Sequence, residues 1–243
     1  MAETLDFSQR AQLEEELDGP CAYEDLRDCL RDLALVNRMV FSHRPILSWL
    51  GRLIDSLPGG VRSGPLRIVD VGCGYGDMLR RIEGWAAQRK LAVELVGVDI
   101  NANGLRAARE ATPRSSAIRW VFGDATTCAG TSNADVILAS GMTHHLCEDE
   151  LVQMIKWMER TAQVGWCVCD LHRKPMPYRI FDLAMRGPWW HRFIRPDGLR
   201  SIRRSFLVED WGRICAEAGL SRTTVAIREY RPARLCVERT KAA

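Results

Sequence analysis

From Leu66 to Leu171 the chain alternates short apolar runs of strand length with segments whose apolar residues recur at helical spacing. Continuous apolar strands between amphipathic helices indicate a parallel sheet that is covered by helices on both faces. An α/β fold is therefore predicted for this part of the chain. The expected strands are Leu66–Val71, Ala92–Asp99, Ile118–Phe122, Ala134–Ala139 and Gly165–Leu171, and the expected helices are Asp77–Lys90, Asn103–Ala111 and Glu148–Thr161.

Different patterns occupy the two ends of the chain. Two amphipathic helices are expected first, over Tyr23–Phe41 and from a cap at Ser42 to about Leu57, where Pro58-Gly59-Gly60 ends the second. A helix at Val208–Ala218 precedes two β-like runs, Ser221–Tyr230 and Arg234–Glu238, and the tight turn between these runs requires an antiparallel pair. We therefore expect an N-terminal helical extension over residues 1–62 and a main domain over 63–243 whose sheet is mixed at one edge.

Composition excludes several classes of protein. The 243 residues are 47% apolar and 27% charged, which is typical of a globular protein. No run approaches the roughly 20 apolar residues of a membrane span, and the polar, acidic N-terminus lacks the pattern of a signal peptide, so a cytoplasmic protein is expected. The nine cysteines contain no C-x-x-C pair, which argues against a disulfide framework or a zinc ribbon, and no metal site is expected.

The segment 172–205 is strongly basic, with nine Arg and Lys against two Asp, although the whole chain carries only +3. Pro177 can begin a helix there, with Ile180, Phe181, Ala184 and Met185 on one face, followed by Trp189-Trp190. We expect a lid insertion before the penultimate helix. Three roles stay open for it: a solvated arginine face, a lid over an amphipathic small molecule that carries an anionic group, or docking on an anionic membrane or RNA.

The chemistry is concentrated where the first predicted strand meets its helix, in Ile68-Val-Asp-Val-Gly-Cys-Gly-Tyr-Gly-Asp77. Glycines at such a turn leave room for a ligand against bare backbone. Acids end three successive strands, at Asp70, Asp99 and Asp124, and parallel strands bring their ends to one crevice. Asp70 would repel a pyrophosphate, so a ligand with an amine and a sulfonium fits better than a dinucleotide.

These residues resemble the motifs of class I S-adenosylmethionine-dependent methyltransferases. The resemblance covers about residues 66–240 and is carried by Val69–Gly76, Gly97-Val-Asp-Ile100, Gly123-Asp-Ala125 and the segment after the fourth strand, Ala139-Ser-Gly-Met-Thr-His-His-Leu146. It implies a Rossmann-like, seven-stranded, mostly parallel sheet with an antiparallel last strand. The implied cofactor is S-adenosylmethionine.

The resemblance also implies roles for individual residues. Asp70 and the glycine turn (Gly72, Cys73, Gly74 and Gly76) would hold the methionine end, and Asp99 would bind the ribose hydroxyls. The adenine would be contacted by Ile100, Asp124 and Ala125, and the sulfonium by the backbone at Ser140.

Three histidines are candidate bases. The methyl group of the cofactor is already activated, so a base is needed only for a protonated acceptor such as a phenol, whose pKa is about 10. His144 and His145 follow the fourth strand and His172 follows the fifth, so all three are expected near the cofactor crevice. The alternative roles are hydrogen bonds that fix the loop, for His144 and His145, and a structural or substrate-orienting role, for His172.

The sequence thus predicts O-methylation of a small lipophilic molecule, of phenolic or polyketide type. The Asp/Asn-Pro-Pro-aromatic motif of adenine N-methyltransferases is absent after the fourth strand, so nucleic acid is not an expected substrate. Two alternatives stay open: C-methylation of a quinone precursor, and a non-catalytic module that binds S-adenosylmethionine or docks on RNA or a membrane. The pattern allows a monomer or a homodimer.

Overall fold

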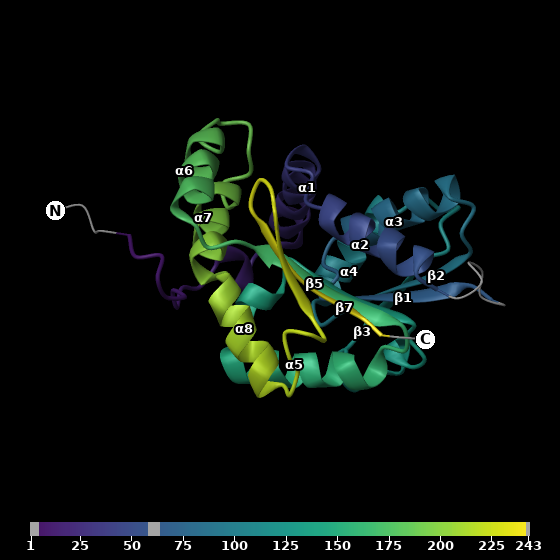
Figure 1. The fold of residues 1–243 in the computed structure, drawn as a ribbon. Coiled ribbons are helices and arrows are strands. Elements are labelled where there is room, and N and C mark those ends of the chain that lie inside the picture. Colours follow the sequence, from purple (N-terminus) through teal and green to yellow (C-terminus); the bar gives the residue numbers. More distant parts are fainter. Residues whose placement is uncertain (1–4, 58–63, 242–243) are drawn as a thin grey trace.

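A seven-stranded sheet forms the centre of the computed structural model, which describes residues 5–57 and 64–241 (Figure 1). Its strand order is β3-β2-β1-β4-β5-β7-β6. β1 to β5 are parallel, and β7 is antiparallel to both of its neighbours, β5 and β6. This confirms the Rossmann-like sheet with a reversed last strand. The strands are β1 (Leu66–Val71), β2 (Val93–Asp99), β3 (Arg119–Phe122), β4 (Val136–Ser140), β5 (Gly165–Leu171), β6 (Ala226–Tyr230) and β7 (Arg234–Thr240).

Helices cover both faces of the sheet, as Figure 1 shows. Successive residues of a strand point to opposite faces, so Ile68 packs in one core and Val69 in the other. The core that holds Ile68 also contains residues of α2 (Arg44–Asp55), α3 (Asp77–Gln88) and α4 (Ala102–Ala111). The core that holds Val69 contains residues of α5 (Glu148–Thr161) and α8 (Val208–Glu217). Apart from β6, whose start is later than expected, the strands and the five helices of these two cores lie close to the predicted positions.

The first helix, α1 (Tyr23–Met39), packs against α4 and against α7 (Ile194–Arg204). The apolar side of this amphipathic helix is only partly buried, because Leu26 is buried whereas Leu33 is 38% exposed. Ser42 does not cap α2: His43 holds the N-cap position, and the Ser42 hydroxyl instead donates to the carbonyl of Asn37. The expected stop at Pro58-Gly59-Gly60 and the 62/63 boundary lie outside the described residues.

The insertion folds as two helices, α6 (Pro175–Ala184) and α7. α6 begins two residues before Pro177, and its expected apolar face is split, since Met185 is buried while Ile180 is 59% exposed. α7 was not among the predicted helices because Pro196 and Gly198 weaken its helical pattern. The two helices pack closely at Gly198, where an added Cβ would lie 2.3 Å from the ring of Phe181.

Shorter elements complete the described chain. Three 3-10 turns, η1 (Glu16–Asp18), η2 (Ala129–Thr131) and η3 (Thr143–His145), lie in connections. β6 starts later than the expected Ser221, because residues 221–224 form a turn closed by a hydrogen bond from the Thr224 amide to the Ser221 carbonyl. Within residues 5–57 and 64–241, none of the helices has both the length and the apolar character that crossing a membrane requires.

The basic segment finds its anionic partners in the same chain. Arg204 forms ion pairs with Glu15 and Asp18, and Arg200 forms one with Glu16. Arg192, which precedes α7 in the basic segment, forms an ion pair with Asp25. The local excess of positive charge therefore attracts the acidic N-terminal segment, which lies far away in sequence, and in these four ion pairs no separate anionic partner is needed.

Residues 7–17 form what we call the N-terminal strap. Arg173, which is 1% exposed, donates to the carbonyls of Phe7 and Ser8 and binds the Asp210 carboxylate at 2.9 Å. At the other end of the strap, the amides of Glu16 and Leu17 donate to Asp197 on α7. Buried charged groups thus fix both ends of the strap against the insertion.

Candidate active site

The turn from β1 into α3 contains three glycines with positive φ, at Gly72, Gly74 and Gly76. An added Cβ at Gly74 would meet nothing within 4 Å, so the backbone there faces open space. At Gly72 the Cβ would lie 2.8 Å from the Met142 side chain, and at Gly76 it would lie 2.1 Å from the ring of Trp120. The structure therefore differs from the expectation that all three glycines leave room for a ligand: Gly72 accommodates Met142 and Gly76 accommodates Trp120.

Gly76 gives a test of this packing. Replacing it with alanine should lower the free energy of unfolding by about 1–3 kcal/mol, because the new methyl group overlaps Trp120 and φ is +73°. The control is Gly84→Ala in α3, where an added Cβ meets nothing within 4 Å, and a gain of about 0.5–1 kcal/mol is expected. Urea unfolding of both variants measures the difference, and equal stabilities would contradict the assignment.

Two carboxylates stand beside the turn. Asp99 accepts hydrogen bonds from the Gly74 amide (2.7 Å) and the Asn101 amide (2.8 Å), and so ties the end of β2 to the turn. Asp70 is 2% exposed, and its buried Oδ1 has no hydrogen-bond partner within residues 5–57 and 64–241. Burial raises the pKa of Asp70 well above its ordinary value, and the charges of Asp77 and Asp99 add to this rise.

An unpaired buried carboxylate oxygen calls for a hydrogen-bond donor or a positive charge. The amine of S-adenosylmethionine supplies hydrogen-bond donors, and its sulfonium supplies a second positive charge. The open backbone at Gly74 leaves room beside them. A pyrophosphate would instead face Asp70, Asp77 and Asp99. The residues present therefore fit the cofactor that the sequence motifs imply.

The other residues expected to bind the cofactor differ in their burial. The Cys73 side chain is buried, and its sulfur lies within 2.8 Å of where a Cβ on Gly97 would be, so it faces the core. Ile100 is 75% exposed. Asp124 is exposed and accepts hydrogen bonds from the amide and hydroxyl of Thr126. Ala125 is buried and Ser140, which ends β4, is half-buried.

The N-terminal helices reach this turn through Asp77, which Asn37 and His43 contact. Nε2 of His43 lies 2.8 Å from the Asp77 carboxylate, and the Asn37 amide donates to the same oxygen at 3.4 Å. Burial alone would raise the pKa of Asp77, but the hydrogen bond and charge of His43 lower it below its ordinary value. The start of α3 is thereby fixed against α1 and α2.

His144 and Asp170 form a buried pair at the ends of β4 and β5. Nδ1 of His144 lies 2.8 Å from Asp170 Oδ1, and the Thr143 hydroxyl and the His144 amide donate to Asp170 Oδ2. Burial alone would lower the pKa of His144, but the Asp170 carboxylate outweighs burial and raises it. The same pairing keeps the pKa of Asp170 far below its usual range despite burial.

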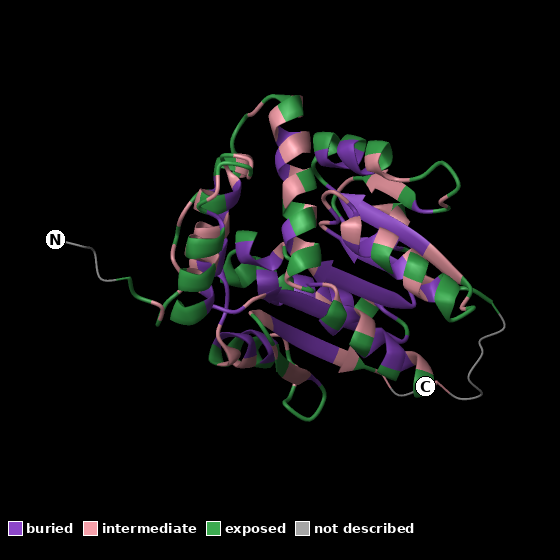
Figure 2. Ribbon diagram, turned by 90° about the horizontal axis from the view of Figure 1, so that it is seen from above, coloured by how far each residue is buried: buried purple, intermediate pink, exposed green. Residues whose placement is uncertain are grey.

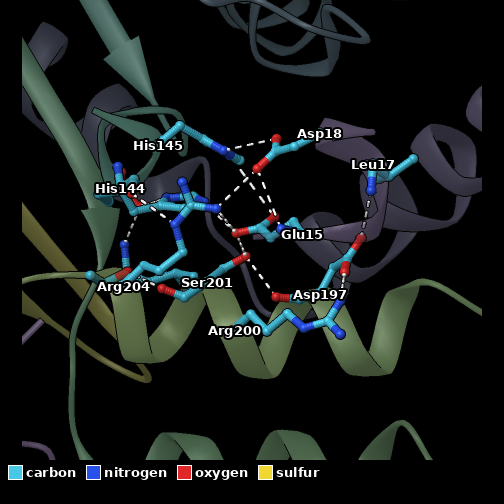
Figure 3. A network of polar contacts seen from close by, with 12 residues as sticks. Glu15, Leu17, Asp18, His144, His145, Asp197, Arg200, Ser201 and Arg204 are labelled. Atoms are coloured by element: carbon cyan, nitrogen blue, oxygen red, sulfur yellow. Dashed lines mark hydrogen bonds and ion pairs between the residues drawn. The ribbon is translucent and has the colours of Figure 1, made fainter. Parts of the chain in front are cut away.

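Glu15 from the strap lies on the other side of this imidazole (Figure 3). Its Oε1 is 3.6 Å from His144 Nε2, accepts a 2.8 Å hydrogen bond from the Ser201 hydroxyl, and lies 3.4 Å from the Arg204 guanidinium. Glu15 is 8% exposed. Sequence reasoning missed this residue; the available signal was the acidic run Glu14–Asp18, whose charge complements the basic segment.

The other two candidate bases have different surroundings. His145 Nδ1 lies 3.2 Å from Asp18, and burial, together with the charge of His144, lowers the pKa of His145 to about 4. His172 is buried, with Nδ1 3.6 Å from Glu229, whose side chain is 53% exposed. Burial lowers the pKa of His172. The structure thus brings His144 and His145 into one cluster, whereas His172 pairs with Glu229.

Glu15, His144 and His145 also offer three ligand atoms within 4.8 Å of one another. However, Oε1 of Glu15 already accepts a hydrogen bond from the Ser201 hydroxyl and lies 3.4 Å from the positive charge of Arg204. A cation is therefore not needed to satisfy the carboxylate, and we assign no metal to this cluster.

A hollow of about 740 Å³ lies beside the strap. His144 and His145 line it together with residues 8–14 and the start of α5, while the residues of the glycine turn do not. We therefore treat it as separate from the cofactor site.

Comparison with known proteins identifies the domain. Residues 68–165 match the family model described as "Methyltransferase domain". A 63-residue segment is 40% identical to the ribosomal RNA large subunit methyltransferase M of Chromohalobacter salexigens, and this segment spans 25% of our chain and only 16% of that relative.

Solved structures share the whole fold at low sequence identity. The plantazolicin methyltransferase BpumL with SAH is 12% identical, with a TM-score of 0.62 over 89% of our chain and 97% of that chain. Magnesium protoporphyrin IX methyltransferase from Synechocystis PCC 6803 with SAH is 14% identical, with a TM-score of 0.54 over 93% and 90%. Human N-acetylserotonin methyltransferase with SAM is 12% identical, with a TM-score of 0.63 over 91% and 57%.

The family match runs from within β1 to the start of β5 and includes the glycine turn, and the likeness to BpumL covers 89% of our chain. Residues 68–165 therefore match a methyltransferase domain, and the chain has the class I, Rossmann-like fold of the S-adenosylmethionine-dependent methyltransferases.

Proposed function

We propose that this protein transfers a methyl group from S-adenosylmethionine to a hydroxyl oxygen of a small lipophilic molecule. The observation that carries the oxygen-directed reaction is the buried His144–Asp170 pair, because an acidic hydroxyl is the acceptor that gains most from a positioned base. Small acceptors are favoured by the structural neighbours, whose names state that they act on plantazolicin, magnesium protoporphyrin IX and N-acetylserotonin.

The cofactor would be held by the residues around the glycine turn. Asp70 would accept from the amine, Asp99 from the ribose hydroxyls, and the backbone of Gly72 to Gly76, Cys73 included, would line the methionine end. When bound, the cofactor supplies an electrophilic methyl group on a sulfonium. The proposed adenine and sulfonium contacts are those of Ile100, Asp124, Ala125 and Ser140.

His144 is the base that the geometry supports best. Its Nδ1 is engaged by Asp170, so Nε2, which lies 3.6 Å from Glu15, is the nitrogen that would take the proton of the acceptor hydroxyl as the oxygen–methyl bond forms. The proton on oxygen moves to nitrogen, and Asp170 stabilises the imidazolium. His145 and His172 remain candidates for orienting the acceptor, because a lowered pKa makes each the weaker base.

The pH dependence follows from the direction of the His144 shift. A base must be unprotonated, and the pKa of His144 is raised, so the rate should fall as the pH drops through a value above about 6.5, the ordinary pKa of histidine. A profile of kcat against pH between 5 and 9.5 measures this. An acid limb at or below the ordinary value would contradict the assignment of His144.

The reaction itself is tested by incubating the protein with S-adenosylmethionine and a panel of alkyl-substituted phenols. Mass spectrometry should show a product heavier by one methyl group, and fragmentation distinguishes a methyl ether from a ring-methylated product. C-methylated products alone would contradict oxygen-directed transfer. Binding of S-adenosylmethionine without any product would leave the chain as a binding module.

A further inference from the structure

The strap brings a carboxylate from the N-terminus to the imidazole that we assign as the base. Figure 3 shows Glu15 directed at His144 from the strap, with Ser201 and Arg204 directed at Glu15 from α7. The ion pair spans 3.6 Å between Glu15 Oε1 and His144 Nε2. Asp170 already occupies Nδ1, so the imidazole lies between two buried carboxylates.

Several contacts keep Glu15 in this position. The Ser201 hydroxyl donates to Oε1 at 2.8 Å, and Arg204 stands 3.4 Å away. The amides of the next two residues donate to Asp197, so the backbone is fixed as well. A carboxylate held this firmly and removed from water acts on a neighbouring charge much more strongly than an exposed one does.

Arg10 links the strap to the backbone of η3. Its guanidinium donates to the carbonyls of Arg204 (2.8 Å), Leu146 (2.9 Å) and His144 (3.3 Å), and it lies over the ring of Phe206. The position of the strap and the position of the His144 backbone are therefore coupled.

We propose that Glu15 is a positioning residue for the methyl-transfer base: the docked strap places its carboxylate beside His144 Nε2, stabilises the imidazolium that forms on proton uptake, and so raises the basicity of His144. This inference rests on the proposed function. It makes a correctly docked N-terminal strap a requirement for full activity, although the strap lies far from the methyltransferase motifs in sequence.

The charges around His144 support the sign of the effect. It is faced by Asp170 from β5, Glu15 and Arg10 from the strap, Arg204 from α7 and His145 from its own turn, and Arg10 opposes a positive charge on His144 as Arg204 does. Arg204 and a protonated His145 oppose a positive charge on His144, while the two carboxylates favour it. Glu15 raises the pKa of His144, in the same direction as Asp170.

The test compares Glu15→Gln with Glu14→Gln. Glu14 precedes Glu15 in the strap and is exposed, so its replacement removes the same charge without reaching the imidazole. The imidazole of His144 is titrated by NMR in each protein without any ligand, with His144→Gln used to assign its signal. We expect the pKa of His144 to fall by about one unit or more in Glu15→Gln and to stay at its wild-type value in Glu14→Gln.

The kinetic arm uses S-adenosylmethionine and whichever alkylphenol of the panel is methylated. In Glu15→Gln the acid limb of kcat should move to lower pH with the NMR value, and the plateau at high pH should fall about tenfold, because a weaker base removes the proton less readily. Glu15→Asp keeps the charge and should restore most of the pKa of His144. If Glu15 had only a structural role, Glu15→Gln would lower kcat at high pH without moving the acid limb of the pH profile.

Each result of these experiments either supports or overturns the proposed role of Glu15. Identical His144 titrations in the wild type and both variants would overturn the inference, as would a shifted titration with an unshifted kinetic limb. If Glu15→Gln does not fold, Ser201→Ala, which frees the Glu15 carboxylate from its hydroxyl donor, must change the pKa of His144, and an unchanged value would overturn the inference. If the wild type methylates no phenol, the proposed function fails, while the NMR comparison still reports on the coupling.

Discussion

We expect His144→Gln to lower kcat for methylation of a phenol by about 10²–10⁴-fold, while the dissociation constant for S-adenosylmethionine should stay within about twofold of the wild-type value. Glutamine fills much of the same space but cannot take up a proton from the acceptor. The cofactor constant should be preserved because the contacts of His144 are to Asp170 and Glu15, whereas the turn is held by Asp99.

A matched control is His191→Gln. This histidine also lies near a carboxylate, with Nε2 3.4 Å from Asp25, but it belongs to the insertion and not to the ends of β4 and β5. Its replacement should leave kcat within about threefold. Equal losses in both variants would point to destabilisation of the fold, and near-wild-type rates in His144→Gln would leave catalysis to positioning alone.

Asp99→Ala is expected to weaken binding of S-adenosylmethionine by about 100-fold, which corresponds to about 2.7 kcal/mol. The carboxylate would be lost both as a proposed partner of the ribose hydroxyls and as the acceptor for the amides of Gly74 and Asn101, so the turn loses its tie to β2. Isothermal titration calorimetry measures the change.

The comparison variant for this prediction is Asp124→Ala. Asp124 is exposed and its described hydrogen bonds are local, to Thr126, so a loss of about threefold to tenfold is expected. If Asp124→Ala weakened S-adenosylmethionine binding more than Asp99→Ala did, Asp124 and not Asp99 would be the more important carboxylate for cofactor binding. Unchanged binding in Asp99→Ala would remove the ribose assignment.

The core of the fold could be predicted because its signals are local. Each strand from β1 to β5 is a short apolar run, and the glycines between β1 and α3 indicate where the strand ends and the helix begins. Figure 2 shows the result, with the central strands almost wholly buried.

The candidate site was only partly predictable, because its missing members act over long sequence distances. Glu15 meets Ser201 across 186 residues, and no local pattern marks that pairing. α7 contains Pro196 and Gly198, so packing and charge stabilise a helix that propensity alone disfavours. Trp120 fills the space that Gly76 was expected to leave for a ligand.

The most direct test of the central claim is a crystal structure of the protein with S-adenosylhomocysteine bound. We expect the amine of the ligand within hydrogen-bond distance of Asp70 and its ribose hydroxyls on Asp99, with the backbone at Gly74 against the methionine end. A structure in which the ligand binds elsewhere, and Asp70 keeps its buried oxygen unpaired, would contradict it.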